Sequence, residues 1–147
     1  MSTVAQLLAI VVTVTSLGAG FVGAWYWRAG RAERLPWRLI RIAQVVAGVQ
    51  LVGALVLLVA GLRPQDDLYW LYASLPVGVG YFAEQIKISV AQGVLDARDL
   101  ADGAAVAALP GPEQSVVVAA ILRRELGVMM VAAFVSAFLA LRAFGTV

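Results

Sequence analysis

The sequence predicts an all-α integral membrane protein, a four-helix bundle of four transmembrane helices with both termini outside the cell. Hydrophobic residues make up 62% of the 147 residues and charged residues only 14%. A soluble domain is about half apolar and about a quarter charged. Four long apolar stretches also follow one another, and the basic residues gather at their ends and do not form a nucleic-acid-binding stripe. We therefore expect one transmembrane domain, with the lipid bilayer as its surroundings and no nucleic-acid partner.

The first predicted span, residues 4–27, contains no charged residue and is long enough to cross a hydrocarbon core of about 30 Å. The chain before it lacks the basic segment of a signal peptide, so we interpret the span as retained. Ser16, Gly20 and Ala24 recur every four residues. Small residues at this spacing let a neighbouring helix approach closely, so we expect these three residues to form a helix-packing face.

The connection at residues 28–38 sets the predicted orientation. It is short and holds four arginines, and Arg41 follows just inside the next helix. The positive-inside rule places such a loop in the cytoplasm. Three further spans then alternate in direction, at residues 39–62, 68–92 and 118–141. Ten of the eleven basic residues are Arg, and Ala, Val and Gly dominate. This bias suggests a GC-rich bacterial genome, and we therefore expect a multi-pass protein of the bacterial cytoplasmic (inner) membrane.

The third and fourth predicted helices are expected to extend into the cytoplasm as a hairpin whose loop is residues 96–112. Four polar residues of the third helix fall at i, i+4, i+7 and i+11, which places them on one face: Gln85, Ser89, Gln92 and Asp96. This stripe either lines a cytoplasmic vestibule or is the solvated face of a helix that has left the bilayer, and we favour the solvated face. We expect Val90 and Val94 to pack against Val116, Ala120 or Ile121.

Five ionisable residues form a predicted charged layer. Helix rise places Glu84, Arg124 and Glu125 about 24 Å from the outer boundary, and Lys87 and Arg41 at the cytoplasmic boundary. Charges at this depth are costly unless they are paired or hydrated. We favour a structural ion-pair layer, with Glu84 paired to Arg124 or Lys87 and Glu125 paired to Arg41. Two alternatives are a proton- or cation-binding role for Glu84 in a transport path and a charged seam that docks a partner subunit. Nearby bases are expected to keep Glu84 ionised, which argues against a proton carrier.

No catalytic constellation is predicted. Cys and His are absent, which excludes thiolate and histidine metal sites, histidine-ligated haem and a histidine general base. The run from Asp99 to Asp102-Gly103 resembles the opening of the CDP-alcohol phosphotransferase signature, whose carboxylates hold metal ions. The arginine of that motif is replaced by Ala107, and its second pair of aspartates is absent, so two metals cannot be held. We interpret both aspartates as caps and turn formers, and we expect no enzyme activity, metal or cofactor.

Two functions are compatible with these features. We favour a non-catalytic subunit or scaffold that assembles with itself or with other membrane subunits. The alternative is a small oligomeric transporter or channel with the charged layer around Glu84 in its path. A cavity that reaches Glu84 from both sides would favour the transporter, and a dry, fully paired layer would favour the scaffold.

Overall fold

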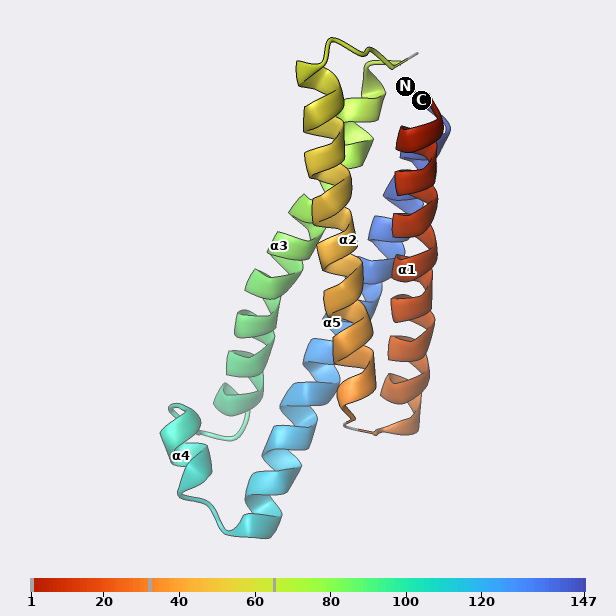
Figure 1. Cartoon of the computed structure of the whole chain (residues 1–147). Helices are drawn as coiled ribbons and strands as arrows, with labels where there is room; N and C mark the ends of the chain where they lie inside the picture. Colours follow the sequence, from red (N-terminus) through yellow and green to blue (C-terminus); the bar gives the residue numbers. More distant parts are fainter. Residues whose placement is uncertain (1, 32, 65) are drawn as a thin grey trace.

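The chain is almost entirely helical in the computed structural model, which describes residues 2–31, 33–64 and 66–147. Figure 1 shows the helices in order: α1 (Ser2–Ala29), α2 (Arg34–Val59), α3 (Leu68–Asp96), α4 (Gly103–Ala107) and α5 (Gly111–Phe144). The prediction of an all-helical protein is confirmed. The four long helices contain the four predicted spans, except that α2 ends before Leu62. The short helix α4 lies inside residues 96–112, which we expected to form a loop.

Three of these helices are long and apolar enough to cross a membrane: Thr3–Ala29, Arg34–Val59 and Gly111–Phe144. The length and the apolar composition of these helices therefore indicate a membrane protein. Helix α3 is not one of the three. Its Gly, Pro and Tyr residues and the charged pair Glu84 and Lys87 lower its mean hydropathy. Its 29 residues nevertheless extend over about 43 Å.

The two ends of the bundle differ. One end holds the α1–α2 connection with its arginines, and we call it the basic end (Figure 1). The opposite end holds both chain termini and the α2–α3 connection, and we call it the terminal end. Helix α5 packs mainly against α1 and α3, and α2 packs mainly against α1. At the basic end, α3 and α5 continue past the α1–α2 hairpin and carry α4 at their tip (Figure 1).

Glycine in the left-handed region ends both helices of the α1–α2 hairpin. Gly30 has φ 65° and Gly61 has φ 73°, a conformation that Gly adopts without a steric cost. After each glycine, the next amide donates back across the helix end, from Arg31 to the Tyr26 carbonyl and from Leu62 to the Leu57 carbonyl, both at 3.1 Å. This Schellman geometry places Leu62 outside α2, although the predicted span included it. The predicted connections also contain Ala32 and Gln65, which lie outside the described residues.

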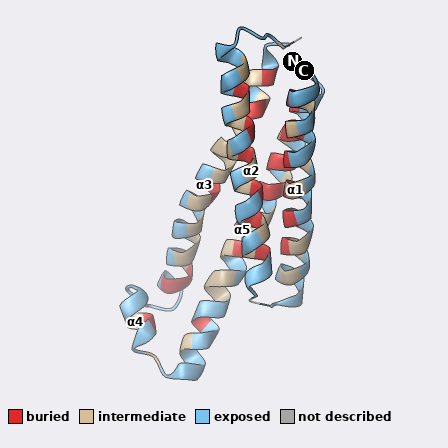
Figure 2. Cartoon of the chain, in the orientation of Figure 1, coloured by how far each residue is buried: buried red, intermediate tan, exposed pale blue. Residues whose placement is uncertain are grey.

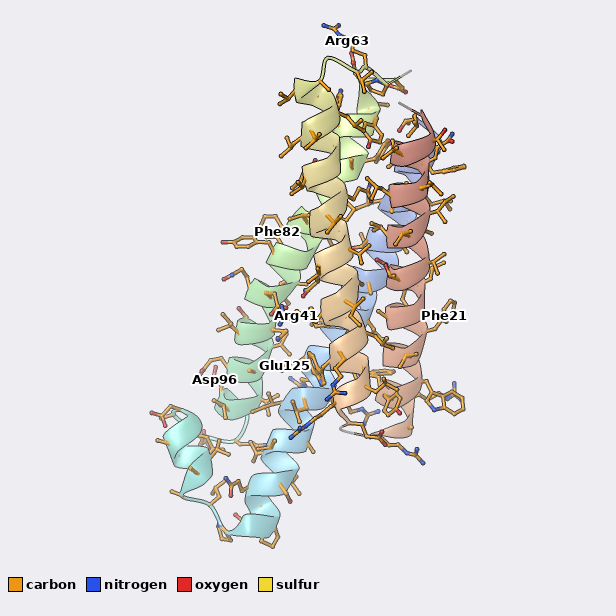
Figure 3. The ribbon with its side chains drawn as sticks, viewed as in Figure 1. Phe21, Arg41, Arg63, Phe82, Asp96 and Glu125 are labelled. Carbon is orange, nitrogen blue, oxygen red and sulfur yellow. The ribbon has the colours of Figure 1, made fainter. Side chains whose placement is uncertain are left out.

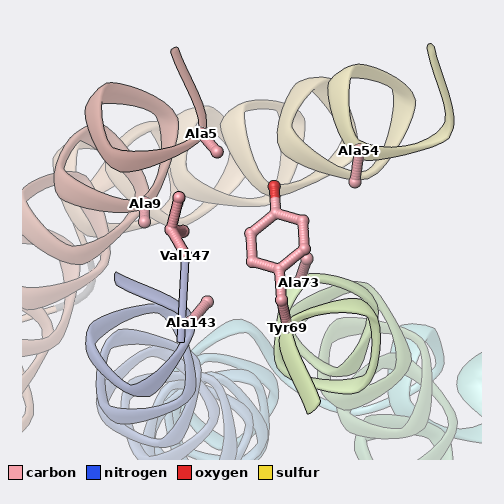
Figure 4. Packing of buried hydrophobic residues seen from close by; sticks show 7 residues of the cluster. All are labelled: Ala5, Ala9, Ala54, Tyr69, Ala73, Ala143 and Val147. Atoms are coloured by element: carbon pink, nitrogen blue, oxygen red, sulfur yellow. The ribbon is translucent and has the colours of Figure 1, made fainter. Parts of the chain in front are cut away.

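The terminal half of the bundle is closed by small side chains packed around one ring. Tyr69 extends from α3 into the space between the other long helices and is fully buried (Figure 4). The buried residues packed with it are Ala5, Ala9, Ala54, Ala73, Ala143 and Val147. Figure 2 shows that buried residues line the inward faces of the long helices and that exposed residues cover their outward faces. This arrangement is expected for a bundle whose outward apolar faces contact lipid.

Gly20, one of the three residues of the predicted small-residue face of α1, lies against α5. Ser16 and Gly20 are buried and Ala24 is half-buried. A Cβ added at Gly20 would lie 2.9 Å from Phe134, and one added at Gly23 would lie 3.1 Å from the Met130 Cβ. The two helix backbones therefore approach too closely for larger side chains.

The extension formed by α3, α4 and α5 has a small apolar core of its own. Leu95, Val106 and Val117 are buried in it, and Leu100, Leu109 and Ile121 pack around them. Val94 is buried and Val90 is half-buried, but Val116 is exposed. Of the three alternatives expected to pack inside the hairpin, Ile121 packs on this core and Val116 does not, because the helix turns about 100° per residue and directs Val117 toward α3 instead.

Candidate functional site

Glu84 is the centre of a polar network between α2 and α3. Its carboxylate accepts hydrogen bonds from Lys87 Nζ at 3.0 Å and from Gln44 Nε2 at 3.1 Å. Arg41 Nη1 lies 3.5 Å from Glu84 Oε1 and donates to Gln44 Oε1 at 2.9 Å. Each side chain in the network therefore contacts at least one other, and Gln44 connects the arginine to the carboxylate.

The side chains of the network become more exposed from the bundle interior to its surface. Relative exposure of the side chains is 19% for Lys87, 31% for Glu84 and 67% for Arg41. Lys87 also lies over the Trp37 ring, with Nζ 5.2 Å from the ring centroid, which is a cation–π geometry. Lys87 and Glu84 are therefore the desolvated pair, and the long Arg41 side chain keeps its guanidinium in a more open position.

The predicted charged layer is only partly assembled into this network. Glu84 pairs with Lys87, which was one of its two expected partners. Arg41, which we expected to pair with Glu125, lies within 4 Å of Glu84 instead. The ion pairs found among the described residues include neither Glu125 nor Arg124. Arg41 and Glu125 both lie toward the basic end of the bundle (Figure 3). Arg124 lines a groove between α3 and α5 that does not include Glu84 or Lys87 in its lining.

Two residues that contact the charged side chains, Trp37 and Gln44, were not predicted from the sequence, although a pattern points to them. Trp37, Arg41 and Gln44 fall at i, i+4 and i+7 of α2, which places them on one helix face. An arginine three residues before a glutamine in an apolar span indicates a polar contact surface, because both side chains need hydrogen-bond partners in a bilayer.

A groove between α2 and α3 gives access to the carboxylate. It has a volume of about 220 Å³ and is lined by Gln44, Pro76, Val77, Gly80, Tyr81 and Glu84. Gln44 and Gly80 also line a much smaller interior space of about 20 Å³, with Ser16 and Ser136 on its other sides. This interior space has room for about one water molecule. Toward the terminal end, the cluster around Tyr69 closes the described part of the bundle.

Comparison with known proteins finds no matching family model, no similar curated protein and no similar solved structure. The described residues also contain no group of three or more acidic side chains that could hold a metal ion. A function for this chain therefore has to be argued from its own geometry.

The predicted polar stripe lies on an exposed face of α3. All four of its members are exposed, and Gln92 Nε2 donates to Asp96 Oδ1 at 2.8 Å. Asp96 lies near the end of α3 at the basic end (Figure 3). Asp102 caps α4, because its carboxylate accepts from the Ala105 amide at 2.9 Å. Asp99 adopts φ 56° at the preceding turn. Asp96 and Asp102 therefore each have a local side-chain hydrogen bond, and Asp99 lies in the turn between them.

Proposed function

We propose that the chain is a four-span protein of the bacterial inner membrane and acts as a non-catalytic subunit or scaffold of a membrane assembly. The observation that carries the proposal is the projecting α3–α5 extension, which presents apolar side chains beyond the bundle. The paired network at Glu84 supports a structural role for the charged residues. In this view the network sets the register of α2 against α3.

The fourth crossing is part of the proposal. Helix α3 packs extensively against α5, which is one of the three apolar candidate spans. A helix of about 43 Å beside α5 would cross the same hydrocarbon core of about 30 Å. The arginines of the α1–α2 connection favour a cytoplasmic basic end, with both termini outside.

Apolar residues on the extension are the proposed partner surface. Val116 is 57% exposed and Val118 is 41% exposed. Val116 lies seven residues before Arg123, which is about 10 Å farther from the bundle along α5. If the arginines mark the membrane boundary, these valines face water on the two flanks of the buried Val117, where exposed apolar side chains are available to a partner.

The alternative transporter is favoured by one observation, which is the groove of about 220 Å³ that reaches Glu84. A transport path also needs an exit toward the terminal end. Among the described residues that side is occupied by the cluster around Tyr69, and the adjoining interior space is only about 20 Å³. Access from one side and a paired carboxylate support the scaffold over a path through a single protomer.

Native mass spectrometry of the protein extracted in nanodiscs tests the proposal. Wild type is compared with Val116→Ser/Val118→Ser, which changes only exposed residues, and with the control Val59→Ser at the terminal end. We expect wild type and control to carry the same additional chains in fixed stoichiometry, and the double variant to lose them. Wild-type protein without additional chains, together with ion flux into liposomes that Glu84→Gln abolishes, would contradict the scaffold and support the transporter.

A further inference from the structure

A second groove lies between α3 and α5, away from the network at Glu84. Its volume is about 600 Å³, within the range of about 300–1,000 Å³ that is typical of small-molecule sites. The α3 wall includes Val79, Phe82, Ile86 and Val90, and the α5 wall includes Gly127 and Val131. Phe82 projects outward from α3 (Figure 3). The groove is therefore apolar and open toward the surrounding bilayer.

The length and position of the groove match one leaflet of a membrane. From Val79 to Val90 the α3 wall extends over about 16 Å, about half of a hydrocarbon core of about 30 Å. One end lies at mid-depth of the bundle and the other at the basic end. An acyl chain of the leaflet at the basic end would fit along this wall.

Cations lie where the headgroup of such a lipid would be. Arg124 is the only charged residue in the lining of the groove, and Trp27 also lines it at the end of α1. The Arg123 guanidinium lies 5.3 Å from the centroid of the Trp27 ring. Arg123 and Arg31 line an adjoining pocket of about 240 Å³, whose described lining includes no acidic residue. Three arginines thus lie around one tryptophan at the basic end, from where their long side chains can snorkel to a phosphate at the membrane surface.

Among the described residues, the nearby carboxylates form no ion pair with these arginines. Glu125 follows Arg124 in the chain and is not among the residues that line the groove. Glu33 accepts a hydrogen bond from the Tyr26 hydroxyl at 3.1 Å. In the described part of the chain, the ion pairs within 4 Å involve only Arg41, Glu84 and Lys87. The three arginines therefore retain the capacity to bind an anion.

We propose that an anionic phospholipid binds here, with an acyl chain in the α3–α5 groove and its phosphate at Arg124 and Arg123. A helix of a second copy would fill the apolar walls but would bury Arg124 without a counter-ion, which is costly in a membrane. A phosphate diester pairs with guanidinium groups through charge-assisted hydrogen bonds. A zwitterionic lipid brings a compensating cation, so the excess of arginine favours an anionic headgroup. This inference requires membrane insertion but not the proposed scaffold role.

The test measures binding of phosphatidylglycerol to delipidated protein in phosphatidylcholine nanodiscs, by counting lipid adducts in native mass spectrometry. Each arginine near an anionic lipid contributes about 1 kcal/mol, so Arg123→Gln/Arg124→Gln should weaken binding about thirtyfold. Arg34→Gln/Arg38→Gln removes the same charge at the same end and should change binding less than about twofold. Val131→Trp should block the groove, whereas the control Val135→Trp, outside the groove lining, should not.

Four outcomes would overturn the proposal. Equal weakening by both arginine pairs would indicate diffuse attraction to the membrane surface. If Val131→Trp retains as many lipid adducts as wild type, the groove takes no acyl chain. The same follows if free glycerol phosphate competes for the site as well as phosphatidylglycerol does. The chain has no Cys, so Val131→Cys supplies a unique thiol. A disulfide-linked dimer that phosphatidylglycerol does not prevent would assign the groove to a second copy of the chain.

Discussion

Adding one methyl group to Gly20 tests the close approach of α1 and α5. An added Cβ would lie 2.9–3.0 Å from three atoms of the Phe134 ring, where carbon contacts are favourable only near 3.5–4.0 Å. The ring is not free to move without a cost. Phe134 packs edge-to-face on Phe21, with centroids 5.2 Å apart and an interplanar angle of 83°. Gly18, two residues earlier, has open space at the same position and is the matched control.

Two opposing effects determine the expected magnitude. Replacing Gly by Ala in a helix interior stabilises it by about 0.5–1 kcal/mol, and this gain is similar at both positions. At Gly20, a fixed ring would cost about 1–3 kcal/mol through overpacking. A displaced ring would instead lose the aromatic contact, which is worth about 0.5–1.5 kcal/mol. Gly20→Ala should therefore be about 0.5–3 kcal/mol less stable than Gly18→Ala, depending on which response the ring makes.

Reversible unfolding by SDS in mixed micelles measures the free energy of unfolding of both variants. The gain in helix propensity is similar in both, so it cancels when the two are compared. Combining Gly20→Ala with Phe134→Leu should recover part of the loss, since the smaller side chain makes room for the methyl group. If Gly20→Ala is as stable as Gly18→Ala, the reasoning about this interface is refuted.

Other substitutions test the polar groups by similar measurements. Both amide atoms of Gln50 are buried without a hydrogen-bond partner among the described residues, so Gln50→Leu should raise the free energy of unfolding by about 1 kcal/mol. Lys87→Met should lower it by about 1.5–3 kcal/mol, because it leaves the Glu84 carboxylate without its closest cation. Arg41→Met should cost below about 1 kcal/mol, since the arginine is largely exposed, and an equal loss would contradict the graded network. Asp102→Ala should destabilise the α4 end by about 0.5–2 kcal/mol, seen as faster amide hydrogen exchange there and unchanged exchange in α1.

Several features were predictable because they depend on local chemistry. Uncharged apolar stretches of more than 20 residues identify α1 and α2 as candidate spans, since backbone groups in a bilayer must be paired within the helix. Asp102 was readable as a cap, because a short side chain with an acceptor can satisfy a free amide at a helix start. Helix rise brought Arg41, Glu84 and Lys87 close in depth, because depth depends on residue count alone.

The rotation of each helix about its axis, and therefore the face that points inward, could be learned only from the tertiary structure. The sequence by itself determined the class of protein, the approximate helices and the depth of the charges. Only packing decided that Glu84 binds Arg41 through Gln44, that Arg124 faces a groove, and that Val117 is buried in place of Val116. The physical reason is that these helices carry apolar residues on nearly every face, so a hydrophobic stripe does not mark the inward face. On α1 the spacing of small residues marks that face in the sequence, whereas on the other long helices only the packing shows it.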